Sequence, residues 1–252
     1  MKIVPRVALA CALVSVLSFA LSSQTVPSQA NVPHVPVVSD GYGVTNIAGQ
    51  PFSADLEVDR TQTLADGSHV HNVQHMKVYR DGEGRMRREM YTRQGPYQQG
   101  PEELSSITIT DTPANAQYSL LPQTLTARRS VLFAPHNLEP ALPRPVTSQI
   151  PQPSPLAPKH ASESLGTQTI EGIVAEGHRN TTTWPVNSQG NDAPMVSVIE
   201  QWQSAEMGLE VLLKINDPRT GETVHRFTNI VRGEPDPSLF QVPADYTIKD
   251  SQ

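Results

Sequence analysis

Three histidines lie close together in the stretch "GSHVHNVQH", at positions 69, 71 and 75. On a strand, side chains an even number of residues apart point to the same face, so His69, His71 and His75 would share one face. Imidazoles at i and i+2 can bind one Zn or Cu ion. The alternative is a solvated strand face, because no cysteine and no adjacent acidic ligand is evident nearby. These three histidines are the candidate metal ligands of the sequence.

Other familiar catalytic patterns are missing from the sequence. It has neither a G-x-S-x-G nucleophile elbow nor an H-E-x-x-H zinc helix. Serines, histidines and acids that merely occur in one chain do not define a catalytic triad, because spacing alone proves nothing. We therefore predict a protein that is not an enzyme, with no catalytic residues and no cofactor.

Two tryptophans are present, Trp184 and Trp202. Trp202 has the same parity as Val196 and Val198 on one expected strand, so it would point to the same face as these valines. Packing in the core and lining of an apolar cavity both fit this pattern. Trp202 is therefore the candidate ligand-binding residue.

A cluster of arginines at positions 85, 87 and 88 lies beside Glu83 and Glu89. Mixed charge on a hairpin is typical of a solvated face. A site for an anionic partner is the alternative.

The beginning of the chain has the layout of a secretory signal peptide. Lys2 and Arg6 precede an uncharged apolar run over residues 7–21, which is too short to span a bilayer comfortably, and small and polar residues follow. We expect a signal peptide over residues 1–23, with cleavage as late as residue 30 as the alternative. The protein is thus predicted to be exported to the periplasm or outer envelope, and not to be an integral membrane protein after cleavage.

Composition narrows the partners further. The one cysteine, Cys11, lies in the apolar run; a lipid-modified Cys11 is an alternative to its removal with the signal peptide. Without it the mature chain has no thiol, which excludes disulfides and favours a bacterial envelope protein. Loss of Lys2 and Arg6 takes the basic residues from 19 to 17 against 25 acids, a formal charge of −8. Nucleic acid is therefore not expected as a partner.

Alternation of apolar and polar residues predicts an all-β protein. In "PFSADLEVDRTQTL" the apolar residues recur at every second position, and turn signals such as Asp66-Gly67 and "DGEG" separate this run from the next ones. No long amphipathic helix is evident. We expect about ten or eleven strands in antiparallel hairpins, over residues 51–64, 68–80, 85–93, 106–111, 116–121, 125–133, 164–170, 173–184, 195–204, 209–217 and 222–233.

These strands fall into two groups. Residues 24–50, rich in Val, Pro and Gly, are expected to form a disordered or extended lead-in, followed by a first half of the β domain over residues 51–133. A proline-rich segment over residues 134–160 precedes the second half, residues 161–250. This segment is either a hinge between two bodies or a surface loop inserted in one continuous sheet, and the second interpretation is favoured because neither half has enough strands for a closed core.

The last fifty residues, "WQSAEMGLEVLLKINDPRTGETVHRFTNIVRGEPDPSLFQVPADYTI", resemble the C-terminal half of LolA/RseB-like periplasmic proteins. The shared order is a strand with Trp202, a Gly-Leu turn, a strand ending in Asp, a Gly turn, a strand ending in an Asn-Ile-type pair, and a closing D-x-x-x-F-x-x-P segment. "MKVYRDGEGRMRREM" and "ITDTPANAQYSLLPQTLTARR" resemble the family's earlier strands, so the resemblance covers most of Phe52 to Lys249. It is specific mainly over Trp202 to Lys249.

This resemblance implies a strongly curved antiparallel half-barrel with an apolar concave face. Leu239 and Phe240 would plug one end of the sheet, and Pro243 to Lys249 would add a final edge strand. Two features depart from the family: its usual opening helix cannot form over "VVSDGYGVTNIAGQ", and the proline-rich segment is long for it. Both bear on the lid of a ligand cavity, so a carrier function does not follow from the fold alone.

Three function hypotheses follow. The first is a non-enzymatic exported envelope protein that binds a lipid or a lipoprotein acyl chain on the concave face, which must then be unfilled. The second is an interaction or sensor module of the RseB type with an envelope protein as its partner. The third is a metal-dependent protein that uses the histidine strand.

Overall fold

The computed structural model describes residues 39, 41–93, 100–133 and 154–250. The expected signal peptide and most of the proline-rich segment lie outside these residues. The described strands are β1 (Phe52–Thr63), β2 (His69–Arg80), β3 (Met86–Arg93), β4 (Glu102–Asp111), β5 (Ala116–Leu121), β6 (Thr126–Val131), β7 (Lys159–Ile170), β8 (Ile173–Trp184), β9 (Met195–Ser204), β10 (Leu209–Asp217), β11 (Gly221–Arg232) and β12 (Thr247–Asp250). Two short 3-10 turns, η2 (Pro122–Thr124) and η3 (Pro237–Phe240), accompany them.

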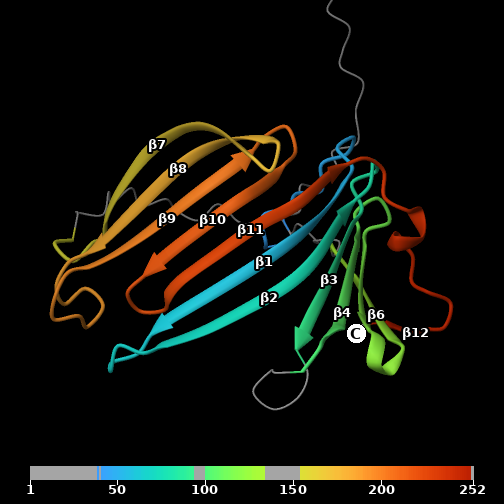
Figure 1. The fold of residues 1–252 in the computed structure, drawn as a ribbon, viewed down its shortest axis with the longest axis horizontal. Coiled ribbons are helices and arrows are strands. Elements are labelled where there is room, and N and C mark those ends of the chain that lie inside the picture. The colour runs from blue at the N-terminus through green and yellow to red at the C-terminus, as the bar shows by residue number, and fades with distance from the viewer. Residues whose placement is uncertain (1–38, 40, 94–99, 134–153, 251–252) are drawn as a thin grey trace, which may run out of the picture. The chain divides into compact units, whose positions relative to one another are not determined.

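All of these strands belong to one open sheet (Figure 1), in the order β12-β6-β5-β4-β3-β2-β1-β11-β10-β9-β8-β7. The predicted all-β fold with a curved sheet is confirmed, with twelve described strands instead of ten or eleven. Neighbouring strands are antiparallel except for the last one, because β12 runs parallel to β6 at the sheet's edge. Strand β1 pairs with β11, and so the two halves of the chain form one continuous sheet.

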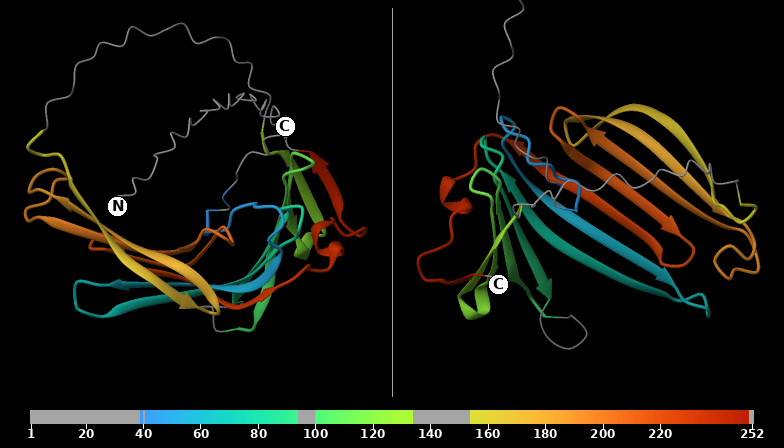
Figure 2. Two further views of the ribbon diagram at one scale, coloured as in Figure 1. Left: turned by 90° about the horizontal axis from the view of Figure 1, so that it is seen from above. Right: turned by 180° about the vertical axis from the view of Figure 1, so that it is seen from behind.

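The alternation in β1 separates two faces of the sheet. Phe52, Leu56 and Val58 are at most 1% exposed, whereas Asp55 and Glu57 point to the opposite face. Seen from above, the sheet curves around residues 41–50 (Figure 2), which pack on the buried side. The apolar face of β1 and β2 is therefore the concave one.

Two hydrophobic clusters lie on opposite faces. The larger cluster is on the concave side and draws on β1, β2, β8, β10 and β11 together with Val44. The smaller one consists of Ile107, Ile109, Leu120 and Ala127. The C-terminal segment covers this smaller cluster with Tyr246, and its β12 extends the sheet beyond β6.

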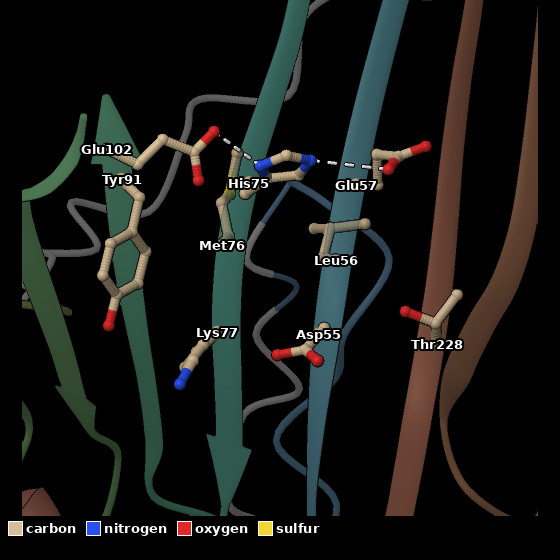
Figure 3. Close-up of a pocket in the computed structure, with 9 residues that line it drawn as sticks. All are labelled: Asp55, Leu56, Glu57, His75, Met76, Lys77, Tyr91, Glu102 and Thr228. Carbon is tan, nitrogen blue, oxygen red and sulfur yellow. Dashed lines mark hydrogen bonds and ion pairs between the residues drawn. The ribbon is translucent and has the colours of Figure 1, made fainter. Parts of the chain in front are cut away.

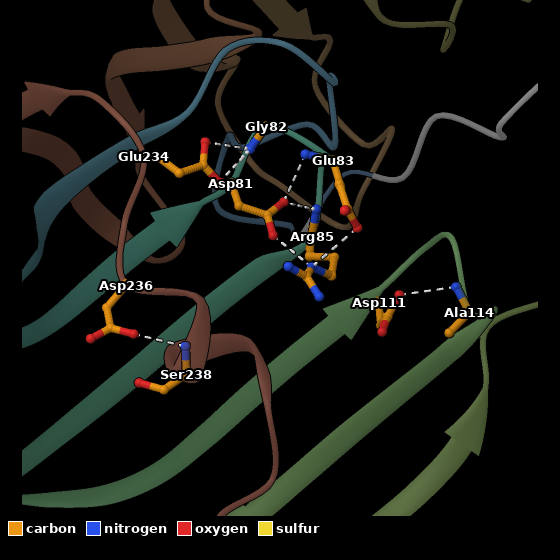
Figure 4. A network of polar contacts seen from close by, with 9 residues as sticks. All are labelled: Asp81, Gly82, Glu83, Arg85, Asp111, Ala114, Glu234, Asp236 and Ser238. Atoms are coloured by element: carbon orange, nitrogen blue, oxygen red, sulfur yellow. Dashed lines mark hydrogen bonds and ion pairs between the residues drawn. The ribbon is translucent and has the colours of Figure 1, made fainter.

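The end of the chain is held as the sequence predicts. Phe240 is 4% exposed, and the guanidinium of Arg85 lies 5.3 Å from the centre of its ring. In Figure 4 the Asp81 carboxylate accepts hydrogen bonds from the backbone amides of Glu83 and Arg85 in the β2–β3 turn. Glu234, which follows β11, accepts from the amide of Gly82 in the same turn. The C-terminal segment is thereby fastened to the β2–β3 hairpin.

Candidate functional site

The three candidate metal ligands lie on one face of β2, as the spacing predicted, and this face is the convex one. The register of β1 and β2 places His69 opposite Thr63, and His75 opposite Glu57. Acidic partners come from neighbouring strands, so the expectation that no acid lies beside the histidines is wrong. His71 pairs with Asp59, with 2.6 Å between Nε2 and Oδ1. The acid was missed because it is distant in sequence and adjacent only through strand pairing.

His75 lies between two carboxylates. Its Nδ1 is 2.8 Å from Oε1 of Glu102 on β4, and its Nε2 is 3.4 Å from Oε2 of Glu57 on β1, as Figure 3 shows. Because the histidines pair with separate acids, they do not converge on a point between them. Within the described ranges, no group of three or more His, Cys, Asp or Glu side chains is arranged to hold a metal ion.

His75 lines a pocket of about 470 Å³ on this convex face. Its other lining residues come from β11, β1, β2, β3 and β4 (Figure 3): Asp55, Leu56, Glu57, Met76, Lys77, Tyr91, Glu102 and Thr228. The hydroxyl of Tyr91 donates to Oε2 of Glu89 at 2.9 Å. Burial, reinforced by this hydrogen bond and by the charge of Glu89, raises the pKa of Tyr91 to about 12. The tyrosine therefore stays a neutral donor at neutral pH.

Trp202 packs in the core. It is half-buried against the larger hydrophobic cluster, and its ring covers Gly177 on β8, where an added Cβ would come within 2.7 Å of it. The ring therefore occupies the space that a side chain at position 177 would need. Of the two interpretations from the sequence, this contact supports core packing.

The arginine cluster does not form one site. Arg85 pairs with Asp81 at the β2–β3 turn, and Arg87 pairs with Glu89 beneath the C-terminal segment. Arg88 lies on the opposite face of β3 from Arg87, with its guanidinium 4.5 Å from the ring centre of Tyr42. The three charges thus act in separate local contacts.

The larger of the two hydrophobic clusters lies on the concave face, and part of the lead-in packs into it. Val44 is fully buried in the larger cluster and bridges to Leu209. The amide of Thr45 donates to the carbonyl of Gly208 at 3.0 Å, and the amide of Glu210 donates to the carbonyl of Gly43 at 2.8 Å. Residues 41–50 thus pack against the sheet as an irregular segment, with a β-bridge at Val44 and a turn at Ala48 and Gly49.

Two glycines allow this close approach. Gly43 has φ +95° and an added Cβ would lie 2.8 Å from Cβ of Glu210. Gly208 has φ +53° and an added Cβ would lie 2.2 Å from Cδ1 of Ile47. Both the left-handed backbone and the lack of space favour glycine at these positions.

Arg80 holds the covering segment in place. It is fully buried on the concave face, and its side chain donates to the carbonyl oxygens of Thr45 at 2.6 Å, Gln50 at 2.7 and 2.9 Å, and Met207 at 2.6 Å. The guanidinium carbon of Arg80 also lies 4.8 Å from the centre of the Phe52 ring. These described partners are backbone carbonyls and an aromatic ring, so the charge is compensated by dipoles instead of a carboxylate. Burial lowers the pKa of Arg80 to about 10, which leaves it charged at neutral pH.

Sequence reasoning missed both Arg80 and the packed lead-in. Arg80 has the same parity as Met76 and Val78, so the strand pattern already places a charged residue on the buried face of β2. Such a residue requires hydrogen-bond partners. The identity of those partners is a tertiary property, because Thr45 and Met207 are 35 and 127 residues away.

Comparison with known proteins gives matches among solved structures alone. No protein-family model and no curated protein matches the chain. An uncharacterized conserved protein from Thermus thermophilus has 12% identity and a TM-score of 0.42, over 82% of this chain and 93% of the other. A chain of the Pseudomonas aeruginosa MucA/MucB complex has 13% identity and a TM-score of 0.40, over 79% of this chain and 58% of the other.

A LolA superfamily protein from Nitrosomonas europaea has 10% identity and a TM-score of 0.33, over 77% of this chain and 91% of the other. The curved antiparallel sheet itself agrees with the all-β fold that the sequence predicts. Identities in this range say nothing about a ligand or a partner. In the part of the chain that the structure describes, no helix is long and apolar enough to cross a membrane.

Proposed function

We propose that this is a non-enzymatic, exported envelope protein that binds a hydrophobic ligand, a lipid or a lipoprotein acyl chain, on its concave face. The ligand takes the place of residues 41–50. The proposal modifies the first hypothesis from the sequence, which required an unfilled concave face. In the described chain, Val44 and Tyr42 of the lead-in already pack into the apolar cluster on that face.

The observation that carries the proposal is the nature of this cover. The apolar cluster that contains Phe52, Leu56 and Met76 also takes in Val44 of the lead-in, and the segment that carries Val44 consists of bends, a β-bridge and a turn instead of a regular element. Irregular segments with few buried apolar contacts are among those that open at a low free-energy cost. The cover can therefore leave while the sheet behind it remains folded.

Arg80 stabilises the state in which residues 41–50 are packed on the sheet. Its hydrogen bonds to Thr45 and Gln50 are satisfied only when the segment is seated. Displacement leaves the buried guanidinium without these acceptors, and a hydrogen bond to a charged group contributes about 1.5–3 kcal/mol. An effective ligand must offset this loss.

An acyl chain can supply that free energy. Burial of apolar surface contributes about 0.8 kcal/mol per methylene. A chain of about a dozen methylenes would therefore contribute roughly 10 kcal/mol before the cost of displacing the lead-in. A short ligand of a few carbons would not open the site.

Native mass spectrometry tests the proposal on mature protein purified from an envelope fraction without detergent, combined with extraction and analysis of lipids. We expect a bound species of lipid mass. A protein that is free of lipid, and that stays so after incubation with phospholipid vesicles, would overturn the proposal.

A further inference from the structure

The lead-in lies against the first residues of β10, in a slot that the pairing of β10 with β11 leaves open. β10 and β11 pair over Leu212–Asp217 and Gly221–Arg226, and β1 pairs with the opposite edge of β11. The first residues of β10 bond instead to residues 43–45, through the two backbone hydrogen bonds between Gly43 and Glu210 and between Thr45 and Gly208. Together with the isolated bridge between Val44 and Leu209, these bonds pair the segment with β10 over a short stretch, as in the addition of a strand to a sheet edge.

The slot has specific requirements at successive positions of its occupant. The residue beside Glu210 must be glycine, and the next one must be apolar, because Val44 is fully buried. The third position is Thr45, whose hydroxyl donates to the carbonyl of Gly208 at 2.7 Å. The fourth is Asn46, whose side-chain amide donates to the hydroxyl of Thr112 at 3.1 Å.

We propose that this slot accepts the same segment, residues 41–47, from a second copy of the chain. The observation behind this is that residues 41–47 form an arm, a segment that is connected to the rest of the sheet at one end. It joins the sheet at β1 through residues 48–51, and its partners Thr112, Gly208 and Glu210 are all distant in sequence. An arm from another copy makes every one of these contacts unchanged, which is why exchange of an identical element is a low-cost route to a dimer.

The inference does not rest on the hydrophobic ligand. A dimer by arm exchange keeps the concave face covered, whereas ligand binding uncovers it. The two proposals can therefore fail separately.

A cysteine pair across the slot tests the exchange in the full-length chain carrying Cys11→Ser. Asn46 and Thr112 are 8% and 7% exposed, so cysteines there meet only when an arm is seated. Chains with Asn46→Cys alone and with Thr112→Cys alone are mixed at high concentration under mild oxidation. We expect a disulfide-linked dimer that contains one copy of each.

Matched variants establish that the dimer is seated in the slot. Adding Gly43→Val to the Asn46→Cys chain should abolish the mixed dimer, because a side chain there meets Glu210. Adding Gly49→Ala should retain it, because Gly49 has a positive φ as well but an added Cβ there has no heavy atom within 4 Å.

A mixture that stays monomeric, while the Asn46→Cys/Thr112→Cys double variant cross-links within one chain, overturns the proposal. If the double variant does not cross-link, native mass spectrometry of the unmodified protein decides. A dimer fraction that rises with concentration and is lost with Gly43→Val supports exchange, and a monomer at every concentration overturns it.

Discussion

Arg80 donates a hydrogen bond of 2.6 Å from Nη1 to the carbonyl oxygen of Thr45, and so a charged residue of the sheet holds the segment that covers the sheet. The same side chain reaches Met207 on the β9–β10 turn. It thus joins three parts of the chain at one buried point.

Replacement of Arg80 by methionine should loosen the lead-in. The carbonyls of Thr45, Gln50 and Met207 lose a charged donor, so we expect the free energy of unfolding to fall by about 3 kcal/mol. Urea denaturation measures this change. Arg128→Met, at an exposed position of β6, is the control, and its free energy of unfolding should change by no more than about 0.5 kcal/mol. Equal stability of the two variants would contradict the role assigned to Arg80.

Gly43→Ala should expel the lead-in, whereas Gly49→Ala should not. Both positions have positive φ, so each substitution carries a backbone cost of about 1 kcal/mol. Only at position 43 would the added Cβ also lie too close to the side chain of Glu210. Limited proteolysis should therefore cut residues 41–50 much faster in Gly43→Ala than in Gly49→Ala. Equal cutting rates would show that the segment is not seated at Gly43.

Zinc should leave the thermal stability unchanged. His71 and His75 pair with separate carboxylates, and a metal that binds only the native state would raise the melting temperature. We expect no shift when Zn²⁺ is added to the mature protein, measured by differential scanning fluorimetry. A rise that disappears with His71→Ala would restore the metal-dependent hypothesis.

Asp217 should contribute stability that depends on pH. Hydrogen bonds from Arg219 lower the pKa of Asp217 to about 2, below its ordinary value of 3.8. A carboxylate with a depressed pKa in the folded state stabilises that state above the unfolded value, and the contribution is lost as pH falls from about 4 through 2. Asp217→Asn should therefore cost about 1 kcal/mol at pH 7, since Arg219 is solvent-exposed.

The difference between wild type and Asp217→Asn should shrink as the pH falls from about 4 through 2 and vanish below that. Urea denaturation at a series of pH values measures it. A difference that persists unchanged at pH 2 would mean that the side chain stabilises the fold by packing and not by its charge.

Most of the strand pattern could be predicted from the sequence because β1 alternates so regularly. Phe52, Leu56 and Val58 specify one buried face, and turn signals such as Gly67 separate the strands. The burial of Phe240 was also expected, because the closing motif places it beside prolines that end a strand. These are local properties, and local sequence specifies them.

The candidate site could not be predicted in the same way. Arg80 is one arginine among several in its hairpin, and only the tertiary fold shows that its acceptors are the carbonyls of Thr45, Gln50 and Met207. Residues 41–50 lack any apolar period because the segment is held by backbone hydrogen bonds and by two apolar contacts with the core, from Val44 and Tyr42. The acids beside His71 and His75 were missed for a related reason, since strand register brings them there.

Hydrogen exchange of residues 41–50 tests the central claim most directly. In the free protein the amide of Thr45 bonds to Gly208, and the amide of Gly49 bonds to Gly82. Exchange is followed in the mature protein with and without phospholipid vesicles that contain a transferable acyl probe. If the ligand displaces the lead-in, these amides lose protection when the probe binds while those of β1 and β2 keep theirs. Probe binding with unchanged or greater protection of residues 41–50 would contradict the account.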